Sequence, residues 1–125
     1  MKIVFLVGLG GALGAMSRHA IAGLLNNPNS VDGFPVGTLI VNILGCFCIG
    51  LLATLLTGDD LWTRQVYAFL VIGILGGFTT FSSFGFEAQT LFLGGRLLEA
   101  GVYVVVSNLG GFVAAYAGYA LADLL

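Results

Sequence analysis

Four long apolar runs joined by short polar connections constrain this fold more than any other feature of the chain. The runs cover about residues 3–25, 36–57, 66–93 and 97–124, and each could cross roughly 30 Å of hydrocarbon as a helix. Because 58% of the 125 residues are hydrophobic and 8% are charged, the chain could not cover this apolar surface against water. The sequence predicts an all-α integral membrane protein with one four-helix transmembrane domain over residues 1–125, crossing a cell membrane several times.

The connections are expected at residues 26–35, which include Pro28 and Asp32, at 58–64 and at 94–96. The apolar run that follows Lys2 is interpreted as the first span, because no small-residue cleavage site stands out after it. With four spans, Lys2 and Arg64 fall on one side of the membrane and Arg18 and Arg96 on the other. This balance predicts no preferred orientation, so oppositely inserted copies could pair as an antiparallel, dual-topology homodimer.

The third run contains a polar interruption, in the stretch GILGGFTTFSSFGFE from Gly73 to Glu87. The pair Gly76–Gly77 precedes the polar residues, and a glycine pair is a place where a membrane helix can open. We therefore expect the third helix to be broken near its middle, exposing carbonyl groups that need a partner. Phe81 and Phe84 would share a helical face. That face could line a path, or it could be ordinary packing with the hydroxyls bonded to the preceding turn.

Further polar side chains lie in the other spans. Asn42 follows Thr38 by one helical turn, and its amide could either join helices or donate to a species moving through the membrane. On the fourth helix, Tyr103, Ser107 and Gly111 recur every four residues, with Asn108 turned away from this stripe by about 100°. Glu87 is the one carboxylate within a span apart from Glu99 and Asp123 near the two ends of the fourth.

Other polar or reactive residues admit plainer interpretations. Arg18 either marks a functional site or extends its side chain to the interface, and His19 is expected at the interface. Cys46 and Cys48 are two residues apart, match no common metal site and are expected as small buried residues. The net charge of −2 offers no basic patch for nucleic acid. The sequence shows no nucleophile with a base, so we expect no enzyme.

The spans instead carry uncharged donors and phenylalanine rings. The donors are the Asn42 amide and the hydroxyls of Thr38, Thr79, Thr80, Ser82, Ser83, Tyr103 and Ser107. Because ring edges are electropositive, such groups can replace the hydration of a small hard anion without the full positive charge that would trap it.

Three motifs resemble the Fluc (CrcB) family of fluoride channels: GGALGAMSR in the first span, GTLIVNILGCF in the second, and GGFTTFSSF leading to Glu87 in the third. The resemblance covers the whole chain. It implies passive export of fluoride through two pores of an antiparallel homodimer in a prokaryotic plasma or inner membrane, which confers fluoride resistance.

The resemblance also implies roles for individual residues. Carbonyl groups of Gly76 and Thr79 would hold a structural Na⁺ at the dimer centre, and Arg18 and Glu87 would belong to a vestibule or polar network. The implied fluoride pore consists of Phe81, Phe84, Asn42, Thr38, Tyr103, Ser107, Thr80 and Ser83.

Some positions depart from the family pattern. His19 replaces an aromatic residue, Ser83 often a threonine, and Gly111 in some members a serine, so a hydroxyl is missing from the polar stripe. The alternative function is a small proton-coupled multidrug exporter, which also pairs four spans antiparallel. Such a transporter needs a carboxylate within the membrane, for which Glu87 is the candidate.

Overall fold

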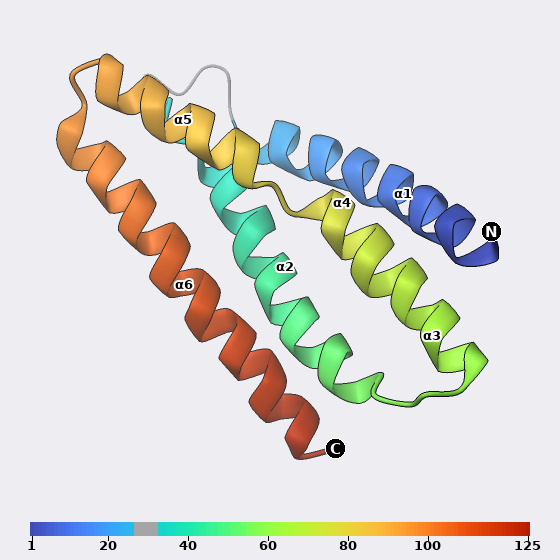
Figure 1. The fold of residues 1–125 in the computed structure, drawn as a ribbon. Helices are drawn as coiled ribbons and strands as arrows, with labels where there is room; N and C mark the ends of the chain where they lie inside the picture. The colour runs from blue at the N-terminus through green and yellow to red at the C-terminus, as the bar shows by residue number, and fades with distance from the viewer. Residues whose placement is uncertain (27–32) are drawn as a thin grey trace.

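The computed structural model describes residues 1–26 and 33–125, and the regular secondary structure in these ranges is entirely helical (Figure 1). The elements are α1 (Lys2–Leu25), α2 (Val36–Leu55), α3 (Leu61–Tyr67), the π-helix η1 (Ala68–Leu75), α4 (Gly76–Phe78), α5 (Phe81–Leu93) and α6 (Leu97–Asp123). Four helical segments are long and apolar enough to cross a membrane: Lys2–Leu25, Val36–Leu55, Leu61–Leu93 and Leu97–Asp123. The prediction of a four-span, all-α membrane protein is confirmed.

The third span begins at Leu61, five residues earlier than the hydropathy pattern predicts. Asp60 caps this helix, because its Oδ1 accepts the backbone N–H of Thr63 at 3.0 Å and its Oδ2 accepts the Thr63 hydroxyl at 2.6 Å. These hydrogen bonds hold the pKa of the Asp60 carboxyl below its usual value. The second connection is therefore shorter than predicted. Of the first connection, Pro28 and Asp32 lie outside the described residues.

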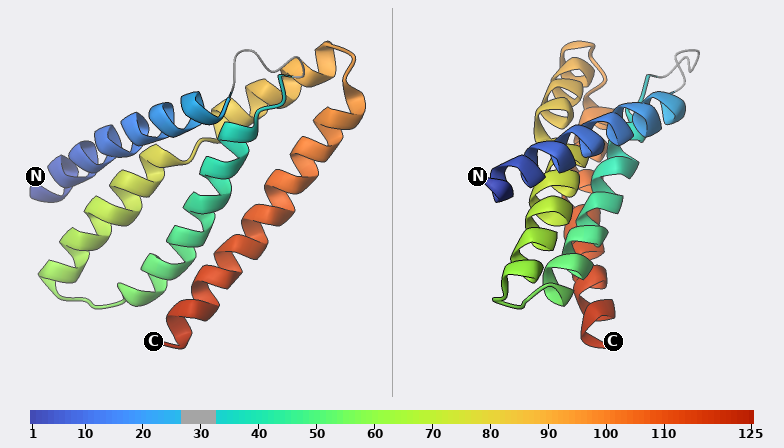
Figure 2. Two further views of the ribbon diagram at one scale, coloured as in Figure 1. Left: turned by 180° about the vertical axis from the view of Figure 1, so that it is seen from behind. Right: turned by 90° about the vertical axis from the view of Figure 1, so that its right-hand side faces the viewer.

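The chain reverses direction at each connection, so the helices form a fan (Figures 1 and 2). α6 packs along α2, while α1 packs across η1 and α4 on the other side of the molecule. Beyond the break in the third span, α5 continues toward the end of the fan where α6 begins, and it packs against α6. The break therefore lies in the middle of the fan, beside α2.

Glycines allow backbones to approach closely where α1 meets η1. A Cβ atom on Gly10 would collide with the carbonyl oxygen of Phe69, and one on Gly14 would collide with that of Ile74. α2 and α6 meet in the same way, through Gly118. Small residues bring membrane helices into dispersion contact where the hydrophobic effect gains little.

The predicted break is present, and it lies just after the glycine pair rather than at it. Thr79 has ψ 156° and Thr80 has φ −149° and ψ 119°, both extended, whereas Gly76 and Gly77 remain in α4. Gly77 instead serves close packing, because a Cβ there would collide with the Gly11 carbonyl. The extended backbone thus begins two residues after Gly77, within the polar run.

One copy of the chain leaves much of its apolar surface uncovered. Phe81 is 82% exposed and Phe112 is 76% exposed. Among the large side chains of the described ranges, those of Tyr103 and Val41 are completely buried. A fan this thin must complete its burial against lipid or against another copy.

Candidate functional site

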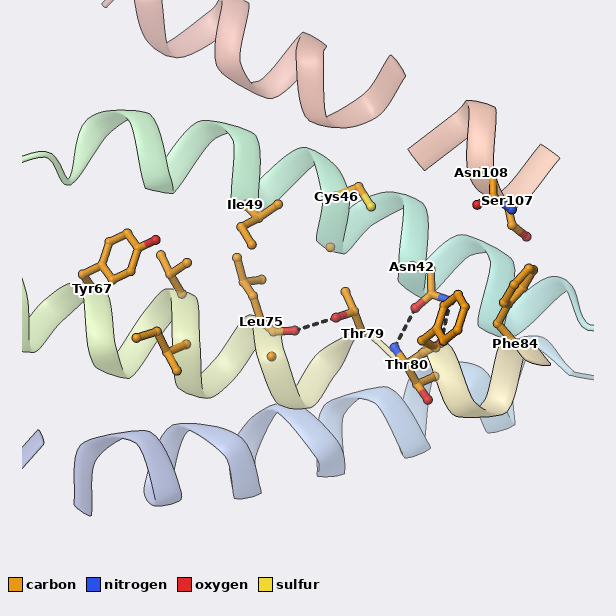
Figure 3. A pocket seen from close by; sticks show the side chains of 15 residues that line it. Asn42, Cys46, Ile49, Tyr67, Leu75, Thr79, Thr80, Phe84, Ser107 and Asn108 are labelled. Atoms are coloured by element: carbon orange, nitrogen blue, oxygen red, sulfur yellow. Dashed lines mark hydrogen bonds between the residues drawn. The ribbon is translucent and has the colours of Figure 1, made fainter. Parts of the chain in front are cut away.

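A cavity of about 580 Å³ opens between α2, η1 and the break in the third span (Figure 3). Its polar lining comes from Asn42 on α2, Thr79 and Thr80 at the break, and Ser107 and Asn108 on α6. The rings of Phe81 and Phe84 and the thiol of Cys46 also line it. The cavity therefore combines uncharged polar groups and aromatic rings from three spans.

The side chain of Asn42 replaces hydrogen bonds that the break removes. Its Oδ1 accepts the Thr80 N–H at 2.8 Å and its Nδ2 donates to the Thr80 carbonyl at 3.0 Å (Figure 3). Joining helices, one of the two roles that the sequence leaves open, is thus present in the structure. Because an amide nitrogen has two hydrogens, a second N–H remains in a residue that lines the cavity.

The break removes the helical donors of several carbonyl groups, among them those of Gly76 and Thr79. In a continuous helix, the carbonyl of Gly76 would accept from the Thr80 N–H, but that N–H donates to Asn42. The carbonyl of Thr79 would accept from the Ser83 N–H, but that N–H donates to Thr80 Oγ1 at 3.2 Å, as the N-cap bond of α5. Gly76 and Thr79 therefore present carbonyl oxygens whose helical donors are engaged elsewhere.

Hydroxyls of the polar run mainly satisfy nearby backbone and side chains. The Thr79 hydroxyl donates to the Leu75 carbonyl at 3.0 Å, and the Thr80 hydroxyl donates to Ser83 Oγ at 3.1 Å. Back-bonding to the preceding turn, the plainer alternative, therefore accounts for Thr79. Thr80 reaches the cavity, whereas Ser83 is not among the residues that line it.

Arg18 reaches from α1 to the break. Its Nε donates to the carbonyl of Gly77 at 3.1 Å. In a continuous helix this carbonyl would accept from the N–H of Phe81, but Phe81 is the first residue of α5, beyond the break. A cation is favourable at a helix C-terminus. The side chain is half-buried and caps α4, a third use beyond the two roles that the sequence leaves open.

Glu87 joins three spans through its two carboxylate oxygens. Thr38 on α2 donates its hydroxyl to Oε1 at 2.7 Å, and Tyr103 on α6 donates to Oε2 at 2.7 Å. Thr38 is 4% exposed and Tyr103 is fully buried, so both hydroxyls are turned toward the carboxylate. The sequence places Glu87 in a network without naming its partners, which lie 49 and 16 residues away.

Ser107 has a buried hydroxyl without a hydrogen-bond partner among the described residues. Its Oγ is buried and makes no hydrogen bond within the described part of the chain, although the residue lines the cavity. A buried hydroxyl without a partner is costly, so this group is available to a ligand.

Four aromatic rings form a chain of contacts beside the cavity. The centroids of Phe81 and Phe84 are 5.5 Å apart, those of Phe84 and Tyr103 are 5.3 Å apart, and those of Tyr103 and Phe34 are 5.6 Å apart. Phe34 meets Tyr103 edge to face. Sequence reasoning missed Phe34, because it lies in the predicted first connection, outside the spans in which polar and aromatic residues were sought.

The side chains of the cavity suit an anion better than a metal ion that takes His, Cys or carboxylate ligands. In the ranges that the structure describes, no three His, Cys, Asp or Glu side chains gather to hold a metal, and Cys46 and Cys48 are free thiols. The cavity itself offers amide and hydroxyl donors together with rings whose edges are electropositive.

Comparisons with known proteins identify the family. A family model described as CrcB-like protein, Camphor Resistance (CrcB), matches residues 5–119. The chain is 43% identical over 119 residues to a fluoride-specific ion channel FluC of Prosthecochloris aestuarii, covering 95% of this chain and 91% of the relative. It is 49% identical over 104 residues to one of Ruminiclostridium cellulolyticum, covering 83% and 79%. It is also 42% identical over 121 residues to one of Chloroflexus aurantiacus, covering 97% and 95%.

Proposed function

This chain belongs to the CrcB family of membrane channels, which are not enzymes, and we propose that it is a fluoride channel that exports F⁻ passively from the cytoplasm. Its relatives bear the name of fluoride-specific ion channels and share more than two fifths of their residues with it. Export of fluoride would confer fluoride resistance.

The observation that carries the proposal is the composition of the cavity wall. The unpartnered Ser107 hydroxyl and the second N–H of Asn42 belong to one cavity, beside the rings of Phe81 and Phe84. Fluoride is small and strongly hydrated. It therefore crosses a membrane only where hydrogen-bond donors of the protein replace the water molecules around it. These donors are uncharged, which lets the ion leave again, as conduction requires.

The channel would act as an antiparallel, dual-topology homodimer with two pores. Phe81 projects from one copy with 82% of its surface exposed, and the cavity beside it is open on one side. A second copy could cover both, its rings serving the pore of the first. The even distribution of the four Lys and Arg residues supports insertion in both orientations.

The freed carbonyls support a structural Na⁺ at the centre of that dimer. The carbonyl oxygens of Gly76 and Thr79 are the ones whose helical donors are engaged by Asn42 and Thr80. Gly76 has open space around its Cα, so a second copy could approach it. Backbone carbonyl oxygens can replace the hydration shell of a monovalent cation. When bound, Na⁺ would supply the positive charge that those oxygens need.

A proton-coupled exporter is less well supported. Its exchange would need a carboxylate free to take a proton and a substrate in turn, whereas both oxygens of Glu87 accept hydroxyl hydrogen bonds from Thr38 and Tyr103. Glu87 is also not among the residues that line the cavity.

Fluoride efflux from liposomes tests the proposal. Purified protein is reconstituted with internal KF, efflux is started with valinomycin, and a fluoride electrode records the rate; a parallel set with KCl is the control. We expect rapid loss of fluoride and little loss of chloride without any proton gradient. Fluoride release that requires an imposed pH gradient would overturn the channel in favour of an exchanger.

A further inference from the structure

Asn108 lies on the cavity wall, although it is turned by about 100° from the polar stripe of the fourth helix. It lines the same cavity as Ser107, its neighbour on α6, and Figure 3 shows the two side chains on the part of α6 near Asn42 and Phe84. The helical wheel places Asn108 and Ser107 about 100° apart. The cavity is wide enough to be lined by both.

The amide of Asn108 has unused hydrogen-bonding capacity. Its Nδ2 donates one hydrogen to the Val104 carbonyl at 2.7 Å, one turn earlier on α6. The second hydrogen of the same nitrogen is directed elsewhere, since the two N–H bonds of an amide diverge. An amide within a membrane span is costly unless such groups find partners.

Position 111, by contrast, contributes nothing to the cavity wall. Gly111 is buried and is not among the residues that line the cavity. A Cβ atom at Gly111 would lie 3.3 Å from Sγ of Cys46, which does line the cavity. The Cys46 thiol therefore occupies the space into which a side chain at position 111 would extend, and it is a weak donor.

We propose that Asn108 is a fluoride-contacting residue, whose free N–H receives the ion from Ser107 in place of a donor at position 111. The inference rests on the proposed function and extends it. The donors then form a sequence from Asn42 through Ser107 to Asn108, along one cavity and across two helices. Each is uncharged, so the ion passes from one donor to the next without being trapped.

The first test is fluoride efflux through Asn108→Leu, which keeps the branched shape of the side chain and removes the donor. A hydrogen bond to an ion is worth enough that we expect efflux to slow by about tenfold or more. Leu109→Ala is the matched control, because Leu109 is adjacent, 61% exposed and outside the cavity lining. It should conduct at the parent rate, and chloride should remain excluded in both variants.

A rescue separates ion contact from a structural role. Cys46→Gly with Gly111→Ser opens the space at position 111 and places a hydroxyl there. Added to Asn108→Leu, this pair should recover a measurable part of the lost rate while the oligomeric state by size-exclusion chromatography stays that of the parent.

Three results would overturn the inference: parent-like efflux through Asn108→Leu, slow efflux accompanied by loss of the parent oligomer, or slow efflux that the pair does not improve. Each of them leaves fluoride conduction by the parent chain intact. Failure of the proposed function is distinct, because the parent chain itself would then release no fluoride.

Discussion

At the scale of single residues, side chains from other spans carry the hydrogen bonds that the third span gives up. Asn42 serves both backbone groups of Thr80, and Arg18 serves the carbonyl of Gly77. Such pairings are needed because a backbone group without a partner inside a membrane costs several kcal/mol. The break is thus stable only because α1 and α2 supply its partners.

Replacing Asn42 by alanine removes both of its bonds to Thr80 and leaves an N–H and a carbonyl unpaired. Each buried group left without a partner costs about 1–3 kcal/mol. We expect Asn42→Ala to lower the unfolding temperature in detergent and to slow fluoride efflux by at least tenfold. Leu44→Ala is the control, because Leu44 is on the same helix with 48% of its surface exposed. Equal efflux through both variants would show that the amide is dispensable.

At the scale of elements, the pairing of α1 with η1 depends on backbone contact. The carbonyl groups of Phe69 and Ile74 lie against Gly10 and Gly14, which leaves no room for side chains there. η1 is a π-helix, a form frequent at functional sites, and it ends at Leu75, with the short helix α4 between it and the break at Thr79. The position of the break is therefore held from α1 as well as from α2.

Gly14→Val should consequently separate α1 from η1 and weaken the whole fold. The new side chain would collide with the backbone of Ile74, which cannot move aside as a flexible side chain can. Overpacking of this kind typically lowers the stability of the fold by about 1–3 kcal/mol. We therefore expect less folded protein in fluorescence-detected chromatography. Gly8→Val is the matched control on the same helix, since nothing lies within 4 Å of a Cβ there. If both variants behave alike, this packing is not what holds the helices.

The sequence predicts elements better than it predicts pairings. Hydropathy is a property of each run, so four spans can be identified without any tertiary information, and the polar run after Gly77 signals the break. The bond from Arg18 to Gly77 joins residues 59 apart, and Thr38 and Tyr103 meet Glu87 from two other helices. The π-helix likewise has no local signal, because its sequence, AFLVIGIL, is simply apolar.

At the scale of the whole molecule, one copy of the chain is incomplete as a membrane pathway. The cavity is open on one side and the ring of Phe81 beside it is exposed. An antiparallel second copy would cover that side, and Na⁺ between the copies would satisfy the carbonyls of Gly76 and Thr79. The proposed dimer, its two pores and its cation therefore depend on one another.

Removal of Na⁺ should accordingly weaken the dimer. Replacing Na⁺ by N-methyl-D-glucamine, too large to be held by backbone carbonyls, leaves those oxygens unpaired, and the linkage between binding and assembly is lost. We expect subunit exchange between differently labelled dimers, measured by energy transfer in liposomes, to become faster by at least tenfold. KCl at equal ionic strength is the control for screening. Equal exchange rates in Na⁺ and in the organic cation would contradict a structural Na⁺ site.

The central claim is that uncharged donors and ring edges at the broken third span conduct fluoride and reject chloride. The most direct measurement is the reversal potential of a planar bilayer containing the protein, with NaF on one side and NaCl at equal concentration on the other. We predict a large reversal potential with the sign of a fluoride-selective conductance. At equal pH on the two sides, this potential should be the same whether or not a proton carrier is present. A reversal potential near zero would contradict it, because fluoride and chloride would then cross equally well.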